Sequence, residues 1–280
     1  MKVLLEGFHP VKHALRFGAV VEGLVVVDLD AAVGLARSHA PELVDVLRER
    51  ARVVDAREFV GIVGRSNNTG VAGWVERPVD RGIVERSSPV VLLDNPRNLG
   101  NFGAVIRVAA GLGAGGVFSL GDVDPWHPTV IRGSAGLHFA LPVGRVDLAD
   151  VVGAPGVGGG AGDGGGAGSV AEVGGPGAGG SDVGAGGPGV GGVAGVGRSG
   201  AGLGGTVIAF DAGGVDLRGV RISDDAVLAF GSERHGLSAA VRGRADLVVS
   251  LPMRDKVSSY NLTTSVAMGL YHWELFRRAS

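Results

Sequence analysis

Short apolar runs alternate with helical patterns along most of this chain. Strands are predicted at residues 90–94, 115–120, 138–143, 206–211, 226–230 and 246–252. Helices are predicted at 101–112, 125–137, 237–245 and 259–278. Because these strands are apolar throughout, instead of alternating with polar residues, they indicate a parallel sheet covered by helices on both faces. The predicted fold class is therefore α/β.

The first 78 residues show a smaller alternation of their own. Strands are predicted at 23–29, 52–56 and 70–78, with a helical pattern at 30–51 that is interrupted at Pro41. The polar, turn-prone stretch 79–88 then predicts a linker. We expect a small α/β domain at 1–78 and a larger domain at 89–280.

Residues 153–205 differ from the rest in composition. They hold 27 of the 53 glycines and only four charged residues. Such a segment buries too little apolar surface to offset the entropy of ordering it. We interpret it as a low-complexity insertion between one strand and the next, where a surface connection lengthens at little cost.

Charge and composition exclude several classes of function. The net charge of −2 argues against nonspecific coating of a polyanion, although a local basic patch remains open. The chain has no cysteine, and the spacing of His9 and His13 lacks a matching carboxylate, so no metal site is expected. The apolar runs are too short for a secretory signal or a membrane span, and a cytoplasmic protein is expected.

Arg107 is the first candidate for chemistry. On the predicted helix, its neighbours one turn away in each direction are Gly103, Ala104, Ala110 and Gly111. This stripe of small residues would let a second chain or a substrate approach the guanidinium closely. The alternative is an ordinary surface arginine. A dinucleotide-binding reading of 111–116 fails, because those glycines follow a helix instead of preceding one.

Polar loops follow two further strands, at the carboxyl ends where parallel α/β sheets bind ligands. One loop holds Gly231 to Glu233, and the other runs from Leu251 to Asn261. Each has a purely structural alternative: Glu233 could cap the next helix, Ser258 or Ser259 could be the N-cap of the last helix, and Asn261 could be a polar residue of its first turn.

Three segments in order carry a family resemblance: "NFGAVIRVAAGLGA", "LAFGSERHGLS" and "LPMRDKVSSYNLTTSVA". With them the chain resembles the SpoU (TrmH-type) branch of the SPOUT RNA methyltransferases. The N-terminal piece "LEGFHPVKHAL…RSNNTGVAGWVERP" looks like the small substrate-binding domain, similar to ribosomal protein L30e, that precedes the catalytic domain in some members. Near-neutral charge suggests shaped RNA contacts, through Arg65, Asn67 and Asn68.

The resemblance implies a C-terminal trefoil knot, a homodimer with its active site completed across the interface, and 2′-O-methylation of a ribose in rRNA or tRNA. S-adenosylmethionine is the implied cofactor, with contacts from Gly231, Leu251, Met253 and Tyr260. The implied catalytic residues are Asn101, Arg107, Glu233, Ser259 and Asn261. Tyr260 departs from the leucine usual in the family.

Two roles for the arginine and two rival functions remain open at this point. Family proposals make the arginine a base, but guanidinium deprotonation is very unfavourable. We favour a role in which Arg107 binds the adjacent phosphate and Glu233 orients its guanidinium group. Ser259 and Asn261 would then hold the ribose or the cofactor by hydrogen bonds. The rival functions are a noncatalytic knotted RNA-binding protein and an antibiotic-resistance rRNA methyltransferase.

Overall fold

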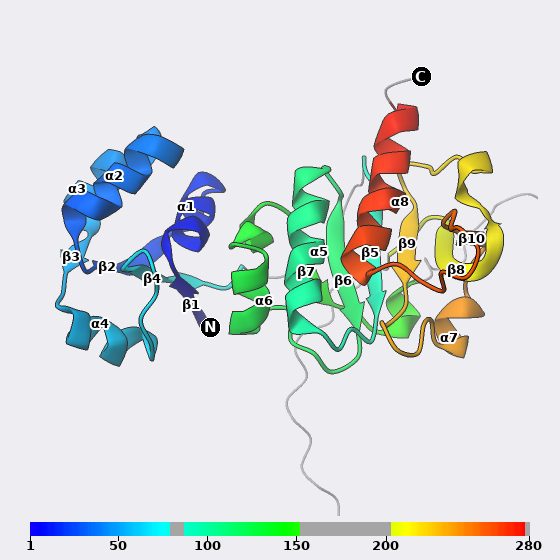
Figure 1. The fold of residues 1–280 in the computed structure, drawn as a ribbon, viewed down its shortest axis with the longest axis horizontal. Coiled ribbons are helices and arrows are strands. Elements are labelled where there is room, and N and C mark those ends of the chain that lie inside the picture. The colour runs from blue at the N-terminus through cyan, green and yellow to red at the C-terminus, as the bar shows by residue number, and fades with distance from the viewer. Residues whose placement is uncertain (79–86, 152–202, 278–280) are drawn as a thin grey trace, which may run out of the picture. The chain divides into compact units, whose positions relative to one another are not determined.

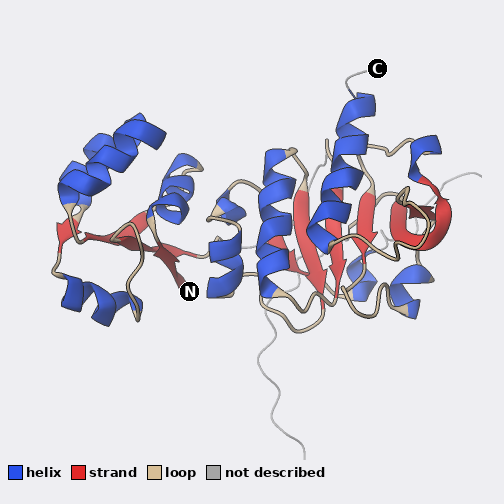
Figure 2. Ribbon diagram, viewed as in Figure 1, coloured by secondary structure: helices blue, strands red, loops and turns tan. Residues whose placement is uncertain are grey.

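The computed structural model describes residues 1–78, 87–151 and 203–277 (Figures 1 and 2). Most of the predicted linker 79–88 and of the predicted insertion 153–205 therefore lies outside the described residues. Within the described ranges, no helix is long and apolar enough to cross a membrane.

The N-terminal strands form a four-stranded mixed sheet in the order β1-β4-β2-β3. The strands are β1 (Lys2–Glu6), β2 (Val21–Val26), β3 (Arg52–Val53) and β4 (Val71–Glu76). Strand β4 is antiparallel to both of its neighbours, while β3 runs parallel to β2. The strands predicted at 23–29, 52–56 and 70–78 are thereby confirmed in position, although β3 is shorter than expected.

Successive residues of these strands face opposite layers, as the pleat requires. Leu24 and Val26 pack with the helices of one face, whereas Val25 packs with the single helix of the other. The first face carries α1 (Phe8–Arg16), α2 (Leu29–His39) and α3 (Val44–Arg50), and the second carries α4 (Ala56–Val63). The sequence patterns did not predict β1, α1 or α4.

Local capping explains where these helices begin. The carboxylate of Asp28 accepts a hydrogen bond from the backbone N–H of Ala31 at 2.9 Å, and Asp55 does the same for Glu58 at 2.7 Å. The break predicted at Pro41 is confirmed: α2 ends at His39, a 3₁₀ turn covers Pro41–Leu43, and α3 follows.

The larger sheet has six strands, all parallel, in the order β10-β8-β9-β5-β6-β7. Its strands are β5 (Val90–Asp94), β6 (Gly116–Leu120), β7 (Val143–Arg145), β8 (Val207–Asp216), β9 (Val227–Phe230) and β10 (Leu247–Ser250). The prediction of a parallel α/β sheet is confirmed. The chain adds strands outward from β5 to β7, and then continues on the opposite side of β5.

Apolar side chains fill both faces of this sheet. In β5, Val91 and Leu93 pack toward α5 and α8, while Val90 and Leu92 join a second cluster that includes Val241 of α7. The helices are α5 (Leu99–Gly111), α6 (Pro128–Gly133), α7 (Ala239–Arg242) and α8 (Leu262–Arg277). Short 3₁₀ turns cover Leu137–Phe139, Leu148–Val151 and Leu217–Gly219. Figure 2 shows α5 and α8 on one face of the sheet.

The predicted strand at 138–143 is wrong. His138 lies in a 3₁₀ turn and is 1% exposed, and the strand begins only at Val143. Hydrogen bonds of the buried ring hold this turn in place: His138 Nε2 donates to the carbonyl of Pro125 at 2.8 Å, and Nδ1 lies 2.8 Å from the hydroxyl of Ser134. An apolar run of this length does not distinguish a buried turn from a strand.

Three predicted helices are shorter than expected. The pattern at 125–137 forms a helix only at Pro128–Gly133, and the pattern at 237–245 only at Ala239–Arg242. The last helix begins at Leu262 instead of 259, because Asn261 accepts a hydrogen bond from the backbone N–H of Thr263 at 2.9 Å. Asn261, and neither Ser258 nor Ser259, is therefore the residue that caps α8.

A close contact between two glycines joins α5 to α6. A Cβ atom on Gly103 would lie 2.4 Å from the carbonyl oxygen of Val130 and 2.7 Å from the Cα of Gly133. The sequence pattern predicts that the glycines of this stripe clear space around Arg107, and for Gly103 that interpretation is wrong. Gly103 is buried and lets the backbones of α5 and α6 touch. Gly111, by contrast, has open space around it.

Alanine substitutions at the two glycines of α5 should have opposite effects. Gly103→Ala should lower the free energy of unfolding by about 2 kcal/mol, because the new methyl overlaps backbone atoms. Gly111→Ala, the matched control, should raise it by up to about 1 kcal/mol through helix propensity alone. Urea titration measures both. Equal effects of the two substitutions would contradict the close helix contact.

His138 should make the stability of this protein pH-dependent. Burial lowers the pKa of His138 to about 4, whereas an unfolded histidine titrates near 6.5. Between these values the unfolded chain binds a proton that the folded chain excludes, so stability is complete above pH 6.5 and falls as the pH decreases toward 4. The loss attributable to this ring is about 3 kcal/mol.

The measurement is the free energy of unfolding at several pH values for the wild-type protein and His138→Gln. The variant should be less stable at pH 7, yet should lose less stability between pH 6.5 and 4. His235→Gln, which removes an exposed ring, is the control and should keep the wild-type slope.

Candidate active site

The strand order of the larger sheet brings two loops together that are far apart in the sequence. Strands β5 and β9 are parallel neighbours, but the chain leaves β5 in one direction across the sheet and returns to β9 from the other. Helices following such a pair diverge, and a crevice opens at the carboxyl ends of the strands. The segment after β5 begins α5, and the segment after β9 is the loop 231–236.

Asn101 lies at the centre of a small hydrogen-bond network in this crevice. Its Nδ2 donates to Glu233 Oε1 at 2.8 Å, and its Oδ1 accepts from Asn261 Nδ2 at 3.3 Å. The backbone carbonyl of Asn101 also accepts from the hydroxyl of Thr263 at 3.3 Å. The structure thus joins the starts of α5 and α8 to the loop after β9. The second carboxylate oxygen of Glu233, Oε2, forms no hydrogen bond with Asn101 or Asn261.

Helix capping places Asn101 in this position. The side chain of Asn98 accepts from the backbone N–H of Asn101 at 3.0 Å and so caps α5. The asparagine-rich start of this helix is therefore divided between two tasks: Asn98 begins the helix, while Asn101 projects toward the loop after β9.

The loop after β9 folds back on itself, and Gly231 permits this. Ser232 and Gly236 exchange two backbone hydrogen bonds of 3.0 Å, which close a tight antiparallel bridge. A Cβ atom on Gly231 would lie 2.0 Å from the carbonyl carbon of Gly236, so no side chain fits there. The buried carboxylate of Asp94, at the end of β5, fixes the far end of the loop by accepting from Ser238 N at 2.6 Å.

A cavity of about 270 Å³ opens beside this network. It has an apolar floor that includes Phe210 and Phe230, whose rings stack with centroids 4.3 Å apart. Its rim is polar and carries several hydroxyl groups and two carboxylates. The residues that line it are Phe210, Asp211, Ala212, Phe230, Gly231, Ser232, Glu233, Gly236, Leu251, Met253, Ser258, Ser259, Tyr260, Leu262 and Ser265.

Tyr260 closes the loop that forms one side of the cavity. Its hydroxyl donates to the carbonyl of Pro252 at 2.9 Å, which ties the two ends of the segment 252–260 together. Ser259, next to it, lines the cavity and forms no hydrogen bond within the described part of the chain. The serine hydroxyl is thus available to a ligand, while the tyrosine hydroxyl already holds the loop.

Arg107 lies outside this cavity. Its side chain is exposed and forms no hydrogen bond or ion pair with the residues that the structure describes. Its charge reaches α1 instead: desolvation lowers the pKa of Lys12, and the positive charges of Arg16 and Arg107 lower it further. Within one chain, Glu233 accepts from Asn101 and forms no contact with Arg107 among the described residues, so the expected contact between Glu233 and Arg107 stays a prediction.

The histidines considered for a metal are likewise occupied elsewhere or exposed. His9 is exposed, and His13 is half-buried with its Nδ1 2.7 Å from the carbonyl oxygen of Ala135. Within residues 1–78, 87–151 and 203–277, no group of three or more histidine or carboxylate side chains is placed to hold a metal ion.

The network and the cavity coincide with the part of the chain that matches a known family. The model of the SpoU rRNA methylase family matches residues 88–154 and 200–271, which include all three segments that meet in the crevice. The chain belongs to the SpoU methylase family.

Individual SpoU relatives extend the comparison. The chain is 28% identical over 274 residues to the 23S rRNA (uridine(2479)-2′-O)-methyltransferase of Streptomyces viridochromogenes, covering 96% of this chain and 80% of that protein. It is 30% identical over 150 residues to the mitochondrial rRNA methyltransferase 3 of Mus musculus. That match covers 51% of this chain but only 34% of the relative, so the chain spans about a third of the length of the mouse protein.

A solved structure shares the fold over the full length of the chain. The SpoU methyltransferase AviRb from Streptomyces viridochromogenes, crystallised in complex with the cofactor AdoMet, matches with a TM-score of 0.67 at 21% identity. The match covers 100% of this chain and 91% of that one. At this identity the comparison establishes the α/β fold with its parallel sheet.

The structure divides the predicted SpoU site residues into three groups. Asn101, Glu233 and Asn261 are joined by hydrogen bonds, and Arg107 stands apart from them. The predicted residues that line the cavity are Gly231, Glu233, Leu251, Met253, Ser259 and Tyr260. Two residues that line the cavity, Phe210 and Asp211, were not predicted. Asp211 could have been found, because a polar residue at the end of a predicted strand was the signal that identified the other two loops.

The Asn101–Glu233 hydrogen bond can be tested by moving the negative charge from one side chain to the other. Asn101→Asp should lower the free energy of unfolding by about 1 kcal/mol, because two carboxylates then face each other in place of a donor and an acceptor. Adding Glu233→Gln should restore most of the loss, since the glutamine amide can donate to the new aspartate. Denaturant titration of the four proteins gives the coupling energy; additive effects would contradict the contact.

Proposed function

We propose that the protein is an S-adenosylmethionine-dependent methyltransferase that acts on a ribose 2′-hydroxyl in structured RNA. The observation that carries this proposal is the meeting of the three family segments at the β5–β9 crevice: two of them line one cavity, and Asn101 of the first is hydrogen-bonded to Glu233 and Asn261 beside it. The Streptomyces relative, named as a 23S rRNA 2′-O-methyltransferase and similar over nearly the whole chain, favours ribosomal RNA as the substrate over transfer RNA.

The residues of the cavity fit this cofactor. An apolar floor with stacked phenylalanine rings suits an adenine base, and exposed hydroxyl and carboxylate groups suit a ribose and a positively charged amino acid portion. We assign Gly231, Leu251, Met253 and Tyr260 to cofactor binding, chiefly through backbone groups. When bound, the cofactor supplies an electrophilic methyl group on a sulfonium sulfur.

The remaining residues position the RNA hydroxyl. Methyl transfer requires the oxygen to approach in line with the bond that breaks, so orientation supplies most of the catalysis. Ser259 lines the cavity, and its hydroxyl has no hydrogen-bond partner among the described residues, so it is available to hold the ribose. Asn101 and Asn261 support Glu233 and the start of α8 from behind, because their amides are engaged with each other.

Arg107 would grip the phosphate next to the reacting ribose and orient the hydroxyl, with that phosphate or solvent taking the proton. A guanidinium remains charged at any physiological pH, so it is unsuited to act as a base. Its exposure outside the cavity supports a homodimer in which Arg107 of one chain completes the active site of the other.

Three further features belong to this proposal. The parallel order β10-β8-β9-β5 and the likeness to AviRb support a trefoil knot in the C-terminal part of the chain. The mixed sheet of residues 2–76 supports an L30e-like RNA-binding domain. Location in the cytoplasm stays a prediction from the sequence.

The rival functions differ in a measurable way. A knotted RNA-binding protein that has lost catalysis would bind RNA but transfer no methyl group. An antibiotic-resistance enzyme would carry out the same transfer and would differ only in its target nucleotide. Mapping 2′-O-methyl sites in total RNA from cells with and without the gene identifies the nucleotide, and a complete absence of transfer would leave the noncatalytic alternative.

Arg107→Ala should abolish methyl transfer while leaving S-adenosylmethionine affinity unchanged, because the side chain does not line the cavity. Transfer is measured with tritiated cofactor and ribosomal RNA, and binding is measured by calorimetry. Arg107→Lys keeps the charge but not the planar fork, so it should recover only a small part of the activity.

Mixing two inactive variants tests the shared site. Chains with Arg107→Ala combined with chains carrying Gly231→Val, which blocks the loop after β9, should regain about a quarter of wild-type activity if random dimers place one intact site in half of the molecules. A mixture that stays inactive, with mixed dimers demonstrated, would show that Arg107 does not act in the partner's site.

A further inference from the structure

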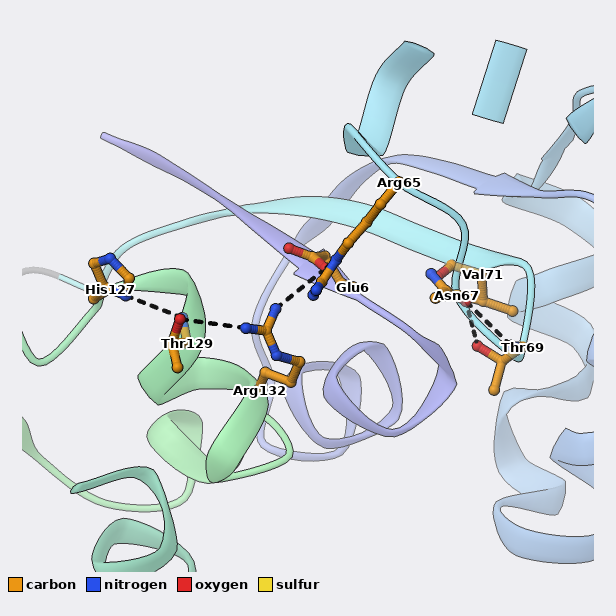
Figure 3. A network of polar contacts seen from close by, with 8 residues as sticks. All are labelled: Glu6, Arg65, Asn67, Thr69, Val71, His127, Thr129 and Arg132. Atoms are coloured by element: carbon orange, nitrogen blue, oxygen red, sulfur yellow. Dashed lines mark hydrogen bonds and ion pairs between the residues drawn. The ribbon is translucent and has the colours of Figure 1, made fainter. Parts of the chain in front are cut away.

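Two arginines that are distant in the sequence converge on one carboxylate (Figure 3). Glu6 ends β1, Arg65 follows α4, and Arg132 lies in the last turn of α6. Arg65 donates to Glu6 Oε2 through Nε, at 2.8 Å, and through Nη2, while Arg132 Nη1 lies 3.5 Å from the same oxygen. The Glu6 side chain is 13% exposed, whereas those of Arg65 and Arg132 are 49% and 43% exposed.

This cluster carries more positive than negative charge. Two guanidinium groups share a single carboxylate, and that carboxylate is largely buried beneath them. Several other arginines among the described residues pair with one carboxylate each, as Arg52 does with Glu58 at 2.6 Å. An excess of one positive charge is therefore left at the surface, where both guanidinium groups retain N–H donors directed to neither Glu6 nor Thr129.

The polar groups beside Arg132 extend the row of donors. Arg132 Nη2 donates to the hydroxyl oxygen of Thr129 at 3.3 Å, so that the hydroxyl proton points elsewhere. His127 Nδ1 accepts from the backbone N–H of Thr129 at 3.1 Å, which leaves Nε2 of the neutral ring as the protonated nitrogen. The exposed edge of His127, Thr129, Arg132 and Arg65 thus offers donors, which suits an anion.

The donors of Arg65, His127, Thr129 and Arg132 are supported by a packed contact between the 1–78 region and the segment around α6. Trp126 and Ile131, next to these donors, are buried in the same apolar cluster as α1, α2 and α3. A Cβ on Gly136 would lie 2.6 Å from the Cα of Pro10, so the backbones touch there. Arg77 adds an ion pair to Asp124 at 3.3 Å. Groups fixed in this way lose little entropy when a ligand binds.

We propose that Arg65 and Arg132 form a clamp for a phosphodiester of the RNA backbone, which rests on the proposed RNA substrate. Arginine forks match phosphate oxygens in geometry and charge, and backbone contacts of this kind set the register of a nucleic acid on a protein. The clamp joins the 1–78 region to the methylase-family part of the chain, so one phosphate would align the substrate with both.

In the loop where Arg65, Asn67 and Asn68 were predicted to contact RNA, the side chain of Asn67 is not available. Asn67 is occupied by its own turn: Nδ2 donates to the carbonyl of Val71 at 3.2 Å, and Oδ1 accepts from Thr69 N at 3.1 Å. The Thr69 hydroxyl oxygen in turn accepts from Phe8 N at 3.0 Å, at the start of α1. The loop thus holds α1 and presents Arg65, so the expected RNA contact of Asn67 is not carried forward.

The experiment measures the salt dependence of RNA binding. A fluorescein-labelled RNA stem-loop is titrated with wild-type protein, Arg65→Gln, Arg132→Gln and the double variant at several KCl concentrations. Loss of one phosphate contact should reduce the magnitude of the slope of log K against log salt by about 0.9. Because the two guanidinium groups hold one phosphodiester, the double variant should show this reduction, and each single variant should show part of it. Arg52→Gln, which makes the same charge change at a one-to-one ion pair, should keep the wild-type slope.

Glu6→Gln distinguishes the clamp from a purely structural ion-pair cluster. Removal of the carboxylate frees both arginines, so RNA affinity should rise by about threefold at low salt and the slope should not decrease. A cluster that only stabilises the fold predicts the reverse: Glu6→Gln and Arg132→Gln would lower the melting temperature together and leave the slope at the wild-type value. That result would overturn the proposal, as would a loss of slope in Arg52→Gln equal to that in Arg65→Gln.

Failure of this inference is separable from failure of the proposed function. If the wild-type protein transfers no methyl group and binds no S-adenosylmethionine, the enzymatic proposal fails while the salt slopes still test the clamp. If the wild-type protein is active and the double variant keeps both its slope and its KM for ribosomal RNA, the clamp is wrong and the enzyme remains. With the clamp, KM should rise and kcat and cofactor affinity should stay near wild type.

Discussion

The parallel pairing of β5 with β9 is the constraint on which the candidate site depends. These strands are neighbours in space although they are far apart in the chain. Asn101 and Glu233, which follow the two strands, lie 132 positions apart, yet Asn101 Nδ2 is 2.8 Å from Glu233 Oε1. Parallel strands end at the same edge of a sheet, so the loops that follow them meet wherever their helices diverge. The cavity and the amide–carboxylate network are consequences of that pairing.

Glycine supports the same geometry at positions where backbones must touch. Gly103 lets α5 approach α6, and Gly231 lets the loop after β9 close on itself. The first contact fixes the helix that carries Asn101, and the second fixes the loop that carries Glu233. A side chain at either position would move one partner of the hydrogen bond, so both glycines contribute to the site through the backbone positions that they allow.

Apolar side chains of the 1–78 region share one buried cluster with Trp126 and Ile131 of the segment around α6, and buried polar groups hold that segment in shape. His138 is satisfied by Pro125 and Ser134 in a neutral form, and Trp126 packs against its ring with centroids 4.8 Å apart. At the surface next to this cluster, Glu6 forms ion pairs with Arg65 and Arg132. Apolar burial supplies the adhesion, while the charges lie at the rim, where water weakens ion pairing but leaves the groups accessible to an anion.

The sequence by itself determined the fold class, the positions of most strands and the loops that carry polar residues, because period and composition are local properties. It did not determine that His138 belongs to a turn, that Asn261 caps α8, or that Glu233 meets Asn101 and not Arg107. Glu233 and Asn101 lie 132 positions apart, so no local pattern records their contact. The partners of His138 and the cap of α8 are nearer in the chain, but neighbouring residues offered competing local patterns: an apolar run typical of a strand at 138–143, and two serines before Asn261. Tertiary structure decided them, because strand order alone selects which loops share an edge and which side chains then compete for one carboxylate.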